Sequence, residues 1–244
     1  GGGEPTLFPR LPELLKEIWT RTAICPNLTT HGLNLSDEFL AKIRGYYGQI
    51  QLSVYDEDPT LEIIDLLVRN KARFGLNYLI TPSRARTLEV DIYNFVRAGA
   101  RDFLLLSYKG DDPTMHLSER ECAMFDESVS RMHERYKASV GFKVDVCWGK
   151  RLTRTPQLLF EGGDCGAGDD SISIGSNKKI LHCSFHGDGG IAFENFEHLR
   201  DIYHSMRHKH LPAGPGCARL PNHGLESSEI VALRPRSSSL VSQR

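Results

Sequence analysis

The chain opens with Gly-Gly-Gly-Glu, a segment that combines a permissive backbone with one carboxylate. Glycine carries no side chain, so Gly2 and Gly3 allow the backbone to pass close to a bound ligand, whereas three glycines are unfavourable inside a helix or strand. The carboxylate of Glu4 then offers an acceptor to a cationic group. A remnant of an expression tag is the competing interpretation, and the Glu-Pro-Thr-Leu that follows argues against it.

Six cysteines are the other candidates for chemistry, and six in a chain of 244 residues are too few for a disulfide scaffold. Their number indicates free thiols, metal ligands or small buried residues in a reducing cytosol, so the expected location is cytoplasmic. Cys25, Cys122 and Cys147 lie in apolar periodic segments without a partner at ligand spacing. We interpret these three as buried small apolar residues.

Cys165, Cys183 and Cys217 lie in a different setting, around a Gly-rich stretch, a predicted hairpin and a Pro-Gly loop. Ligation of zinc or an iron–sulfur cluster would require the three thiolates to converge with a fourth ligand. His182, His186 or an open iron site could complete such a set. Free thiols are the alternative, so the pattern proposes metal ligands without choosing the metal.

Alternating strand and helix patterns must position these residues. Apolar periodicity predicts helices over residues 11–19, 36–43, 61–73, 88–96 and 118–135, and strands over residues 23–30, 50–54, 76–80 and 103–106. Four strand–helix repeats favour parallel strands with right-handed crossovers. An α/β barrel and a doubly wound sheet both fit this pattern, and four repeats are too few for a complete eight-stranded barrel.

Polar residues follow the predicted strands at their carboxyl ends, where parallel sheets bind ligands. They are Thr30, His31, Ser53, Asp56, Thr81, Ser83, Ser107 and Lys109. Lys109 suggests an unrelated α/β-barrel lyase or aldolase, an interpretation that leaves the later cysteines unexplained. The set as a whole predicts a site at one edge of the sheet.

The pattern changes after about residue 140. A strand over residues 142–148 precedes a hairpin of residues 171–174 and 180–183, whose pairing would bring the segments carrying Cys165 and Cys183 together. A helix is predicted over about residues 193–206. We therefore divide the chain into a partial barrel (residues 1–140), a small hairpin and helix extension (141–224) and a disordered tail (225–244).

The composition is that of an ordinary globular protein. A net charge of −1 gives no basis for binding nucleic acid or an anionic membrane. No apolar run approaches the roughly 18 residues of a membrane span, and no signal segment is recognisable. We therefore expect no nucleic acid and no membrane among the partners.

Four segments, in order, resemble radical S-adenosylmethionine (radical SAM) enzymes. Gly-Gly-Glu-Pro-Thr-Leu at residues 2–7 resembles the segment after their second strand, and Thr-Thr-His-Gly-Leu at 29–33 resembles the end of their third, with His31 in place of Asn. Leu-Ser-Val-Tyr-Asp at 52–56 is similar to their fourth strand. Residues 165–183 resemble the start of the family's SPASM or twitch extension, which holds an auxiliary iron–sulfur cluster.

The resemblance implies an α/β fold, a partial (β/α)6 TIM-type barrel of parallel strands that lacks its first β/α unit and carries a small C-terminal extension. It also implies that S-adenosylmethionine (SAM) is bound by Gly2, Gly3, Glu4, Thr30 and Ser53. Glu4 would accept hydrogen bonds from the methionine ammonium, and Ser53 would face the ribose or carboxylate. Cys165, Cys183 and Cys217 would be ligands of a possible auxiliary [4Fe–4S] cluster.

Three departures from the family pattern limit what is carried over. The Cys-x3-Cys-x2-Cys motif that binds the catalytic [4Fe–4S] cluster is absent, so we expect its cysteines upstream of Gly1, and we expect the chain to be an inactive N-terminally truncated fragment. Asn177-Lys178 stands at the hairpin turn in place of Asp-Gly, with an expected strain for Lys at the Gly position. No Cys-x2-Cys follows Cys183, which favours a twitch-like or degenerate extension.

The reaction implied for the parent enzyme is reductive cleavage of SAM to methionine and a 5′-deoxyadenosyl radical, which abstracts hydrogen from a peptide or small-molecule substrate. A flavodoxin- or ferredoxin-type electron donor is implied as a partner. The alternative is a non-catalytic barrel whose zinc or iron–sulfur knuckle acts as a binding module. The residues preceding Gly1 would separate these two interpretations.

Overall fold

A computed structural model describes residues 3–56, 59–156, 165–185 and 190–207 of the chain. The strands of its larger, parallel sheet are β1 (Leu28–Thr30), β2 (Ile50–Ser53), β3 (Phe74–Ile80), β4 (Asp102–Ser107) and β5 (Gly141–Val144). A smaller antiparallel sheet is formed by β6 (Ser173–Ile174), β7 (Lys179–Leu181) and β8 (Ile191–Ala192). We call residues 3–156 the barrel region and residues 165–207 the extension.

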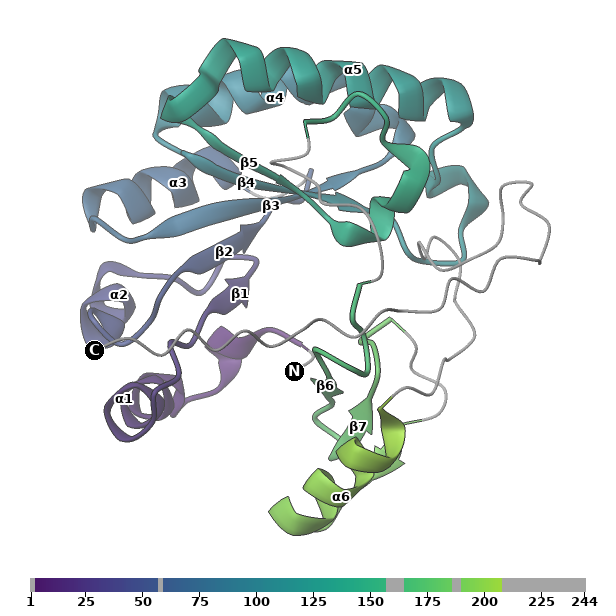
Figure 1. The fold of residues 1–244 in the computed structure, drawn as a ribbon. Coiled ribbons are helices and arrows are strands. Elements are labelled where there is room, and N and C mark those ends of the chain that lie inside the picture. Colours follow the sequence, from purple (N-terminus) through teal and green to yellow (C-terminus); the bar gives the residue numbers. More distant parts are fainter. Residues whose placement is uncertain (1–2, 57–58, 157–164, 186–189, 208–244) are drawn as a thin grey trace, which may run out of the picture.

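The helices follow the strands in alternation. They are α1 (Leu11–Arg21), α2 (Asp37–Ile43), α3 (Thr60–Arg69), α4 (Pro82–Ala98), α5 (Glu119–Tyr136) and α6 (Phe196–Met206), with short 3₁₀ turns η1 (Pro5–Leu7), η2 (Pro113–Met115), η3 (Lys137–Ser139) and η4 (Val146–Arg151). Helices α1 to α5 lie in succession around the outer side of the parallel sheet, and α6 packs beside the small sheet (Figure 1).

The parallel sheet has the strand order β1-β2-β3-β4-β5, which is the order of the chain. A doubly wound sheet reverses its strand order at a switch point, and no reversal occurs among these five strands. The structure therefore selects the partial barrel from the two architectures that the sequence left open. The parallel pairing of β5 with β4 continues the sheet past residue 140, and the division into domains stays a prediction.

Alternating burial along the strands separates two faces of the sheet. On β2, Ile50 and Leu52 are buried in the core, whereas Gln51 and Ser53 are half-buried. Side chains of successive strand residues point to opposite faces, so Gln51 and Ser53 lie on the face away from the helices. On β2 this interior side of the partial barrel is therefore polar.

Local capping explains where several helices begin. The hydroxyl of Ser36, predicted as an N-cap, accepts a hydrogen bond from the amide of Phe39 at 3.1 Å. Ser118 and Glu121 form a reciprocal capping box at the start of α5. Pro82 takes the first helical position behind the N-cap Thr81, so α4 begins six residues before the predicted start at residue 88.

The predicted strand over residues 142–148 is wrong in its second half. Strand β5 ends at Val144, and the carboxylate of Asp145 then accepts a hydrogen bond from the amide of Cys147 at 3.0 Å, which starts η4. The predicted strand over residues 23–30 is likewise confined to Leu28–Thr30. In both segments the apolar pattern covers more residues than the paired strand does.

The extension contains the predicted hairpin and one further strand. β6 pairs with β7 in the register Ser173 to Leu181 and Ile174 to Ile180, and β8 adds a third strand that the sequence did not predict. Lys178 at the turn has φ of 56°, so it adopts the left-handed conformation that the missing glycine would favour. The predicted strain at this turn is therefore confirmed.

Candidate cofactor-binding site

Glu4 is the centre of a compact hydrogen-bonded group that joins the N-terminal segment to the end of β1. As the N-cap of η1, its Oε1 accepts from the amide and the hydroxyl of Thr6 at 3.1 and 2.5 Å. The same oxygen accepts from the Thr30 hydroxyl at 2.6 Å, and Oε2 accepts from the amide of His31 at 2.9 Å. These hydrogen bonds join Glu4 to residues that lie 26 and 27 positions later in the chain.

The carboxylate of Glu4 is held in its ionised form. Burial raises its pKa, but hydrogen bonds from Thr30, from Thr6 and from the backbone of His31 and Thr6 outweigh this effect and hold the pKa below the usual range for glutamate. The side chain is only 10% exposed, so little solvent screens its charge. The site is therefore a sheltered anion at the carboxyl edge of the sheet.

His31 lies beside this carboxylate, with its Nε2 at 3.4 Å from Glu4 Oε2. Its Nδ1 accepts a hydrogen bond from the amide of Leu33 at 3.0 Å, so the proton of the neutral ring lies on Nε2, facing Glu4. The sequence analysis had named His31 only as a strand-end residue and as a departure from the family pattern. Its contact with Glu4 is a finding of the structure.

Two glycines near Glu4, Gly3 and Gly32, adopt a left-handed backbone conformation. Gly3 has φ of 73°, and a Cβ there would meet no atom of the described residues within 4 Å. Gly32 has φ of 86°, and a Cβ there would lie 2.7 Å from Leu52 and 2.8 Å from Ile63. Gly32 is therefore required by both conformation and packing. Gly2, the other predicted glycine of the site, lies outside the described residues.

The two other predicted binding residues, Thr30 and Ser53, lie at the ends of different strands. Thr30 is buried, and its hydroxyl donates to Glu4 and accepts from the amide of Gly32 at 3.0 Å, so its first role in this structure is to support Glu4. Ser53 ends β2 on the interior side of the sheet, in register with Asn77 of β3. Direct contact of Thr30 and Ser53 with a cofactor stays a prediction.

Asn77 is a candidate that the sequence analysis missed. Its side-chain Oδ1 is buried without a hydrogen-bond partner among the described residues, on the same interior side as Ser53. A buried carbonyl oxygen without a donor is unfavourable, so a ligand that supplies a donor there would be stabilised. The strand register was the only signal that could have found Asn77, and the sequence alone does not give it.

Arg84, also missed, holds the loop that follows Ser53. Its guanidinium donates to the carbonyl of Val54 at 2.9 Å and to Asp56 Oδ1 at 2.8 and 2.5 Å. The side chain of Arg84 is 10% exposed and lies over the ring of Tyr78, 5.0 Å from its centroid. Arg84 therefore fixes the backbone on the carboxyl side of the candidate site.

A second polar cluster occupies the ends of β4 and β5. The ammonium of Lys109 pairs with Asp145, and the two side chains are 7% and 10% exposed. Lys109 Nζ also donates to the carbonyl of Ser107 at 3.3 Å and lies 4.6 Å from the ring centroid of Phe185, which belongs to the extension. Since this amine is buried and paired with Asp145, the structure offers no support for Lys109 as the nucleophile of a lyase or aldolase.

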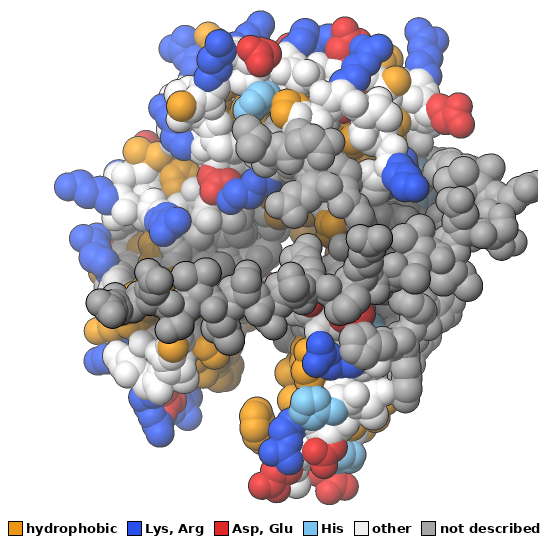
Figure 2. Space-filling view, in the orientation of Figure 1, with side chains coloured by type: hydrophobic (Ala, Val, Ile, Leu, Met, Phe, Trp, Pro, Cys, Tyr) orange, Lys and Arg blue, Asp and Glu red, His pale blue; other side chains and the backbone are white. Residues whose placement is uncertain are grey.

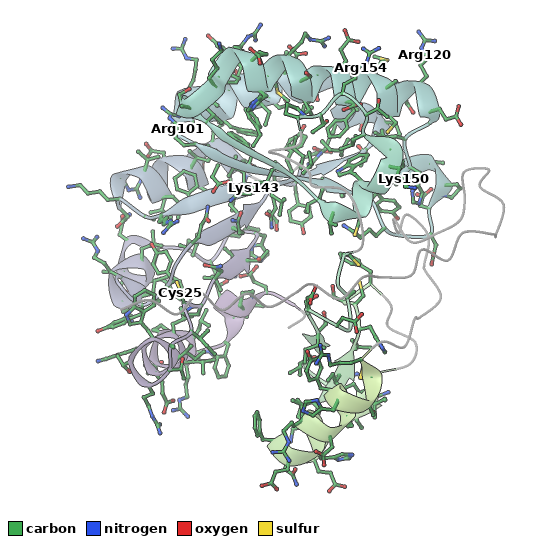
Figure 3. All side chains as sticks on the ribbon, viewed as in Figure 1. Cys25, Arg101, Arg120, Lys143, Lys150 and Arg154 are labelled. Atoms are coloured by element: carbon green, nitrogen blue, oxygen red, sulfur yellow. The ribbon has the colours of Figure 1, made fainter. Side chains whose placement is uncertain are left out.

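The cysteines divide as follows. Cys122 is buried, as predicted, and burial raises the pKa of its thiol. Cys25 is exposed (Figure 3), so its prediction as a buried residue is wrong, because β1 begins only at Leu28 and leaves Cys25 in the preceding loop. Cys147 is half-buried.

The metal-ligand prediction is not tested by the structure. Cys165 and Cys183 are half-buried, and Cys217 lies outside the described residues. Across the part of the chain that the structure describes, no three or more His, Cys, Asp or Glu side chains form a group that could hold a metal ion. His182 is engaged with the carbonyl of Met206 at 3.3 Å, and His186 is not described. The proposed ligand set of Cys165, Cys183 and Cys217 therefore stays a prediction.

The surface carries charges of both signs. Lys and Arg side chains gather over α4 and α5, with acidic side chains among them (Figure 2), and several are paired, as Arg131 is with Glu89 at 2.7 Å. Among the helices of the described residues, none has the length and apolar character of a membrane span.

Comparisons with known proteins show which solved structures have a similar fold. No family model matches the sequence, and neither does any curated protein. Among solved structures, Streptococcus suis SuiB bound to the precursor peptide SuiA has a TM-score of 0.65 at 18% identity over 83% of this chain and 52% of that one. SuiB bound to S-adenosylmethionine has a TM-score of 0.63 at 16% identity over 83% and 52%. Native anSMEcpe with bound AdoMet has a TM-score of 0.56 at 15% identity over 77% and 60%.

SuiB and anSMEcpe are radical SAM enzymes. The chain shares their fold, a parallel α/β partial barrel followed by a small antiparallel sheet, and this confirms the fold that the order of the motifs predicts. At these identities the likeness establishes the fold alone. The chain spans about half the length of SuiB.

Proposed function

We propose that this chain is part of a radical SAM enzyme and that Glu4 binds the ammonium of the methionine moiety of SAM. The observation that carries the proposal is the ionised, sheltered carboxylate of Glu4 at the carboxyl edge of a radical SAM barrel. A cationic ammonium is the group that such an anion favours. The fold neighbours bound to S-adenosylmethionine support the choice of ligand.

The residues present fit the rest of SAM as well. Ser53 and Asn77 lie in register on the interior side of the sheet, where a hydroxyl and an unpartnered amide oxygen could bind the polar groups of a nucleoside. A Cβ at Gly3 would meet no atom of the described residues within 4 Å, and Arg84 fixes the loop after Ser53. When bound, SAM supplies methionine and a 5′-deoxyadenosyl radical on one-electron reduction, and these residues bind and orient it.

The residues of this chain do not fit the catalytic [4Fe–4S] cluster, because the sequence contains no Cys-x3-Cys-x2-Cys. We assign no step through that cluster to them. In this proposal its cysteines precede residue 1 in the whole protein, so the chain alone binds SAM without cleaving it. A cytoplasmic flavodoxin- or ferredoxin-type donor belongs to the same proposal.

A peptide is the substrate class that we propose. SuiB is bound to a precursor peptide in one neighbour, and anSMEcpe is bound to a peptide in another. The extension, with Phe185 at the carboxyl end of β4, would border the substrate side of the barrel. Cys165, Cys183 and Cys217 remain the proposed ligands of an auxiliary cluster.

The alternative is a non-catalytic barrel whose zinc or iron–sulfur knuckle acts as a binding module. The two proposals differ in their expectation for the full-length protein. A radical SAM enzyme would cleave SAM after anaerobic reconstitution with iron and sulfide, whereas a binding module would leave it intact.

Glu4→Gln tests the binding site directly. Glutamine retains an oxygen for the N-cap of η1 but removes the charge, and a hydrogen bond to a charged group contributes about 1.5–3 kcal/mol. We therefore expect SAM to bind about 10- to 100-fold more weakly, measured by isothermal titration calorimetry on the full-length protein.

Glu62→Gln is the matched control, because this substitution makes the same charge change at an exposed position of α3. It should leave the affinity for SAM unchanged. An unaltered affinity in Glu4→Gln, with its fold intact by circular dichroism, would rule out the proposed role of Glu4.

A further inference from the structure

The carboxylate of Glu4 is surrounded by polar groups of the chain itself. Oε1 accepts three hydrogen bonds, two from Thr6 and one from Thr30. Oε2 accepts from the amide of His31 and lies 3.4 Å from His31 Nε2. A carboxylate offers about four acceptor positions, so Oε1 is filled, and the position left on Oε2 faces the imidazole Nε2 of His31.

One of these donors differs from the others in its freedom to leave. The contacts from Thr6, Thr30 and the His31 amide are 2.5 to 3.1 Å long and belong to the backbone turns that build the site. The contact from His31 Nε2 is the longest, at 3.4 Å, and comes from a side chain that is 28% exposed. Rotation of this ring would open Oε2 at the cost of the hydrogen bond from the Leu33 amide to Nδ1, and would leave η1 and the end of β1 intact.

We infer that the imidazole of His31 occupies the acceptor position on Glu4 Oε2 that the α-ammonium of an amino-acid-type ligand takes, and that the ligand displaces it. This inference rests on the proposed function, in which that ligand is SAM. His31 is then an internal competitor that sets the affinity and specificity of the site. A ligand with an ammonium contacts Glu4 Oε2 only after it displaces the imidazole ring. A ligand without an ammonium leaves the ring in place.

Two variants separate the contact with Glu4 from the local turn. His31→Asn retains a side-chain acceptor for the amide of Leu33, as Asn does in turns of this kind, but is too short to supply the imidazole Nε2–H. His31→Ala removes both interactions. If the ring competes, both variants bind SAM about 2- to 10-fold more tightly than the full-length parent, the range expected for one neutral hydrogen bond.

The ligand 5′-methylthioadenosine supplies the matched control, because it retains the nucleoside and lacks the amino-acid ammonium. Its affinity should be the same in the parent, His31→Asn and His31→Ala. In ¹⁵N NMR spectra of imidazole-labelled protein, addition of SAM should shift the His31 Nε2 resonance, and addition of 5′-methylthioadenosine should leave it in place.

The outcomes distinguish this inference from the proposal beneath it. If Glu4→Gln weakens SAM binding but His31→Asn leaves it unchanged or weakens it, His31 is not a competitor and the inference is overturned. If Glu4→Gln has no effect, the proposed role of Glu4 fails first. In the double variant Glu4→Gln/His31→Asn the gain from the histidine substitution should disappear, and a gain that persists would also overturn the inference.

Discussion

The barrel region and the extension differ in how their candidate residues are held in place. The barrel region has one continuous core that includes the fully buried Phe103, Phe125 and Trp148. The core of the described part of the extension contains three buried side chains, Ile180, Ile202 and Met206. Burial of about 25 cal/mol per Å² makes the larger core far more stabilising.

This difference has a consequence for chemistry. The position of Glu4 follows from a strand end and turns next to the large core, through hydrogen bonds with Thr6, Thr30 and His31. A small unit with so few buried side chains usually depends on a metal, a disulfide or contact with a larger body for its stability. We therefore expect the positions of Cys165 and Cys183 to depend on what the extension binds.

The largest effect should come from the core of the barrel region. Phe125 of α5 is fully buried and stacks on Trp148, with ring centroids 4.6 Å apart. Phe125→Ala should lower the free energy of unfolding by about 3–5 kcal/mol, because it leaves a cavity that the surrounding side chains fill only in part. Urea denaturation followed by far-UV circular dichroism measures this change.

Ile180→Ala is the counterpart in the extension, where Ile180 is fully buried. It should speed the hydrogen exchange of β6, β7 and α6 while the main urea transition stays in place, since the extension opens without the barrel region. An equal shift of the main transition by both variants would show that the two regions unfold as one unit and would break the comparison.

The same contrast governs what the sequence could predict. Helices and strands of the barrel region were readable because amphipathic periods and caps such as Ser36 act locally. The resemblance located Glu4, Thr30 and Ser53, but their contacts join positions far apart in the chain. Local patterns could not show that His31 faces Glu4.

Errors arose where a local pattern continued beyond its element. Asp145 lay inside a predicted strand, and its pairing with Lys109 depends on the register of β4 and β5, which no single segment encodes. Cys25 was assigned to a strand that begins three residues later. In the first case a cap by Asp145 starts η4 directly after the strand, and in the second the pairing with β2 decides where β1 begins.

The last described segment of the barrel region, residues 153–155, should give the next largest effect. Asp126 of α5 is 2% exposed, and its carboxylate accepts hydrogen bonds from the amides of Thr153, Arg154 and Thr155, each at 2.7 Å. Asp126→Asn replaces one of these acceptor oxygens with a donor. We expect a loss of about 1–3 kcal/mol in the free energy of unfolding and faster hydrogen exchange in residues 153–155.

The effect of Asp126 should depend on pH. Burial raises its pKa, but the hydrogen bonds from Thr155, Arg154 and Thr153 outweigh this and lower the pKa below the usual value. The stabilisation is therefore present above the unfolded-state pKa of about 3.9 and is lost as the pH falls through the lower folded-state value. The gap between parent and Asp126→Asn should be constant near pH 7 and shrink below about pH 4.

Asp65→Asn is the control for this segment, since Asp65 is exposed and pairs only with Arg69 in the same helix. An exposed pair of this kind contributes less than about 1 kcal/mol. If the two aspartate variants lower the free energy of unfolding by the same amount, Asp126 does not hold residues 153–155 in place in solution.

The smallest effect should come from the contact that joins the extension to the sheet. Phe185 is 60% exposed and lies over the ammonium of Lys109, whose pair with Asp145 closes the ends of β4 and β5. Phe185→Leu retains apolar bulk and removes the aromatic face, which at an exposed site contributes about 0.5–1 kcal/mol. Hydrogen exchange in residues 180–185 should accelerate about 2- to 5-fold, with β4 and β5 unchanged. Phe185→Tyr should retain the parent's rates, because its ring also attracts a cation. Equal rates in Phe185→Leu and the parent would mean that the contact with Lys109 does not position the extension against the barrel region.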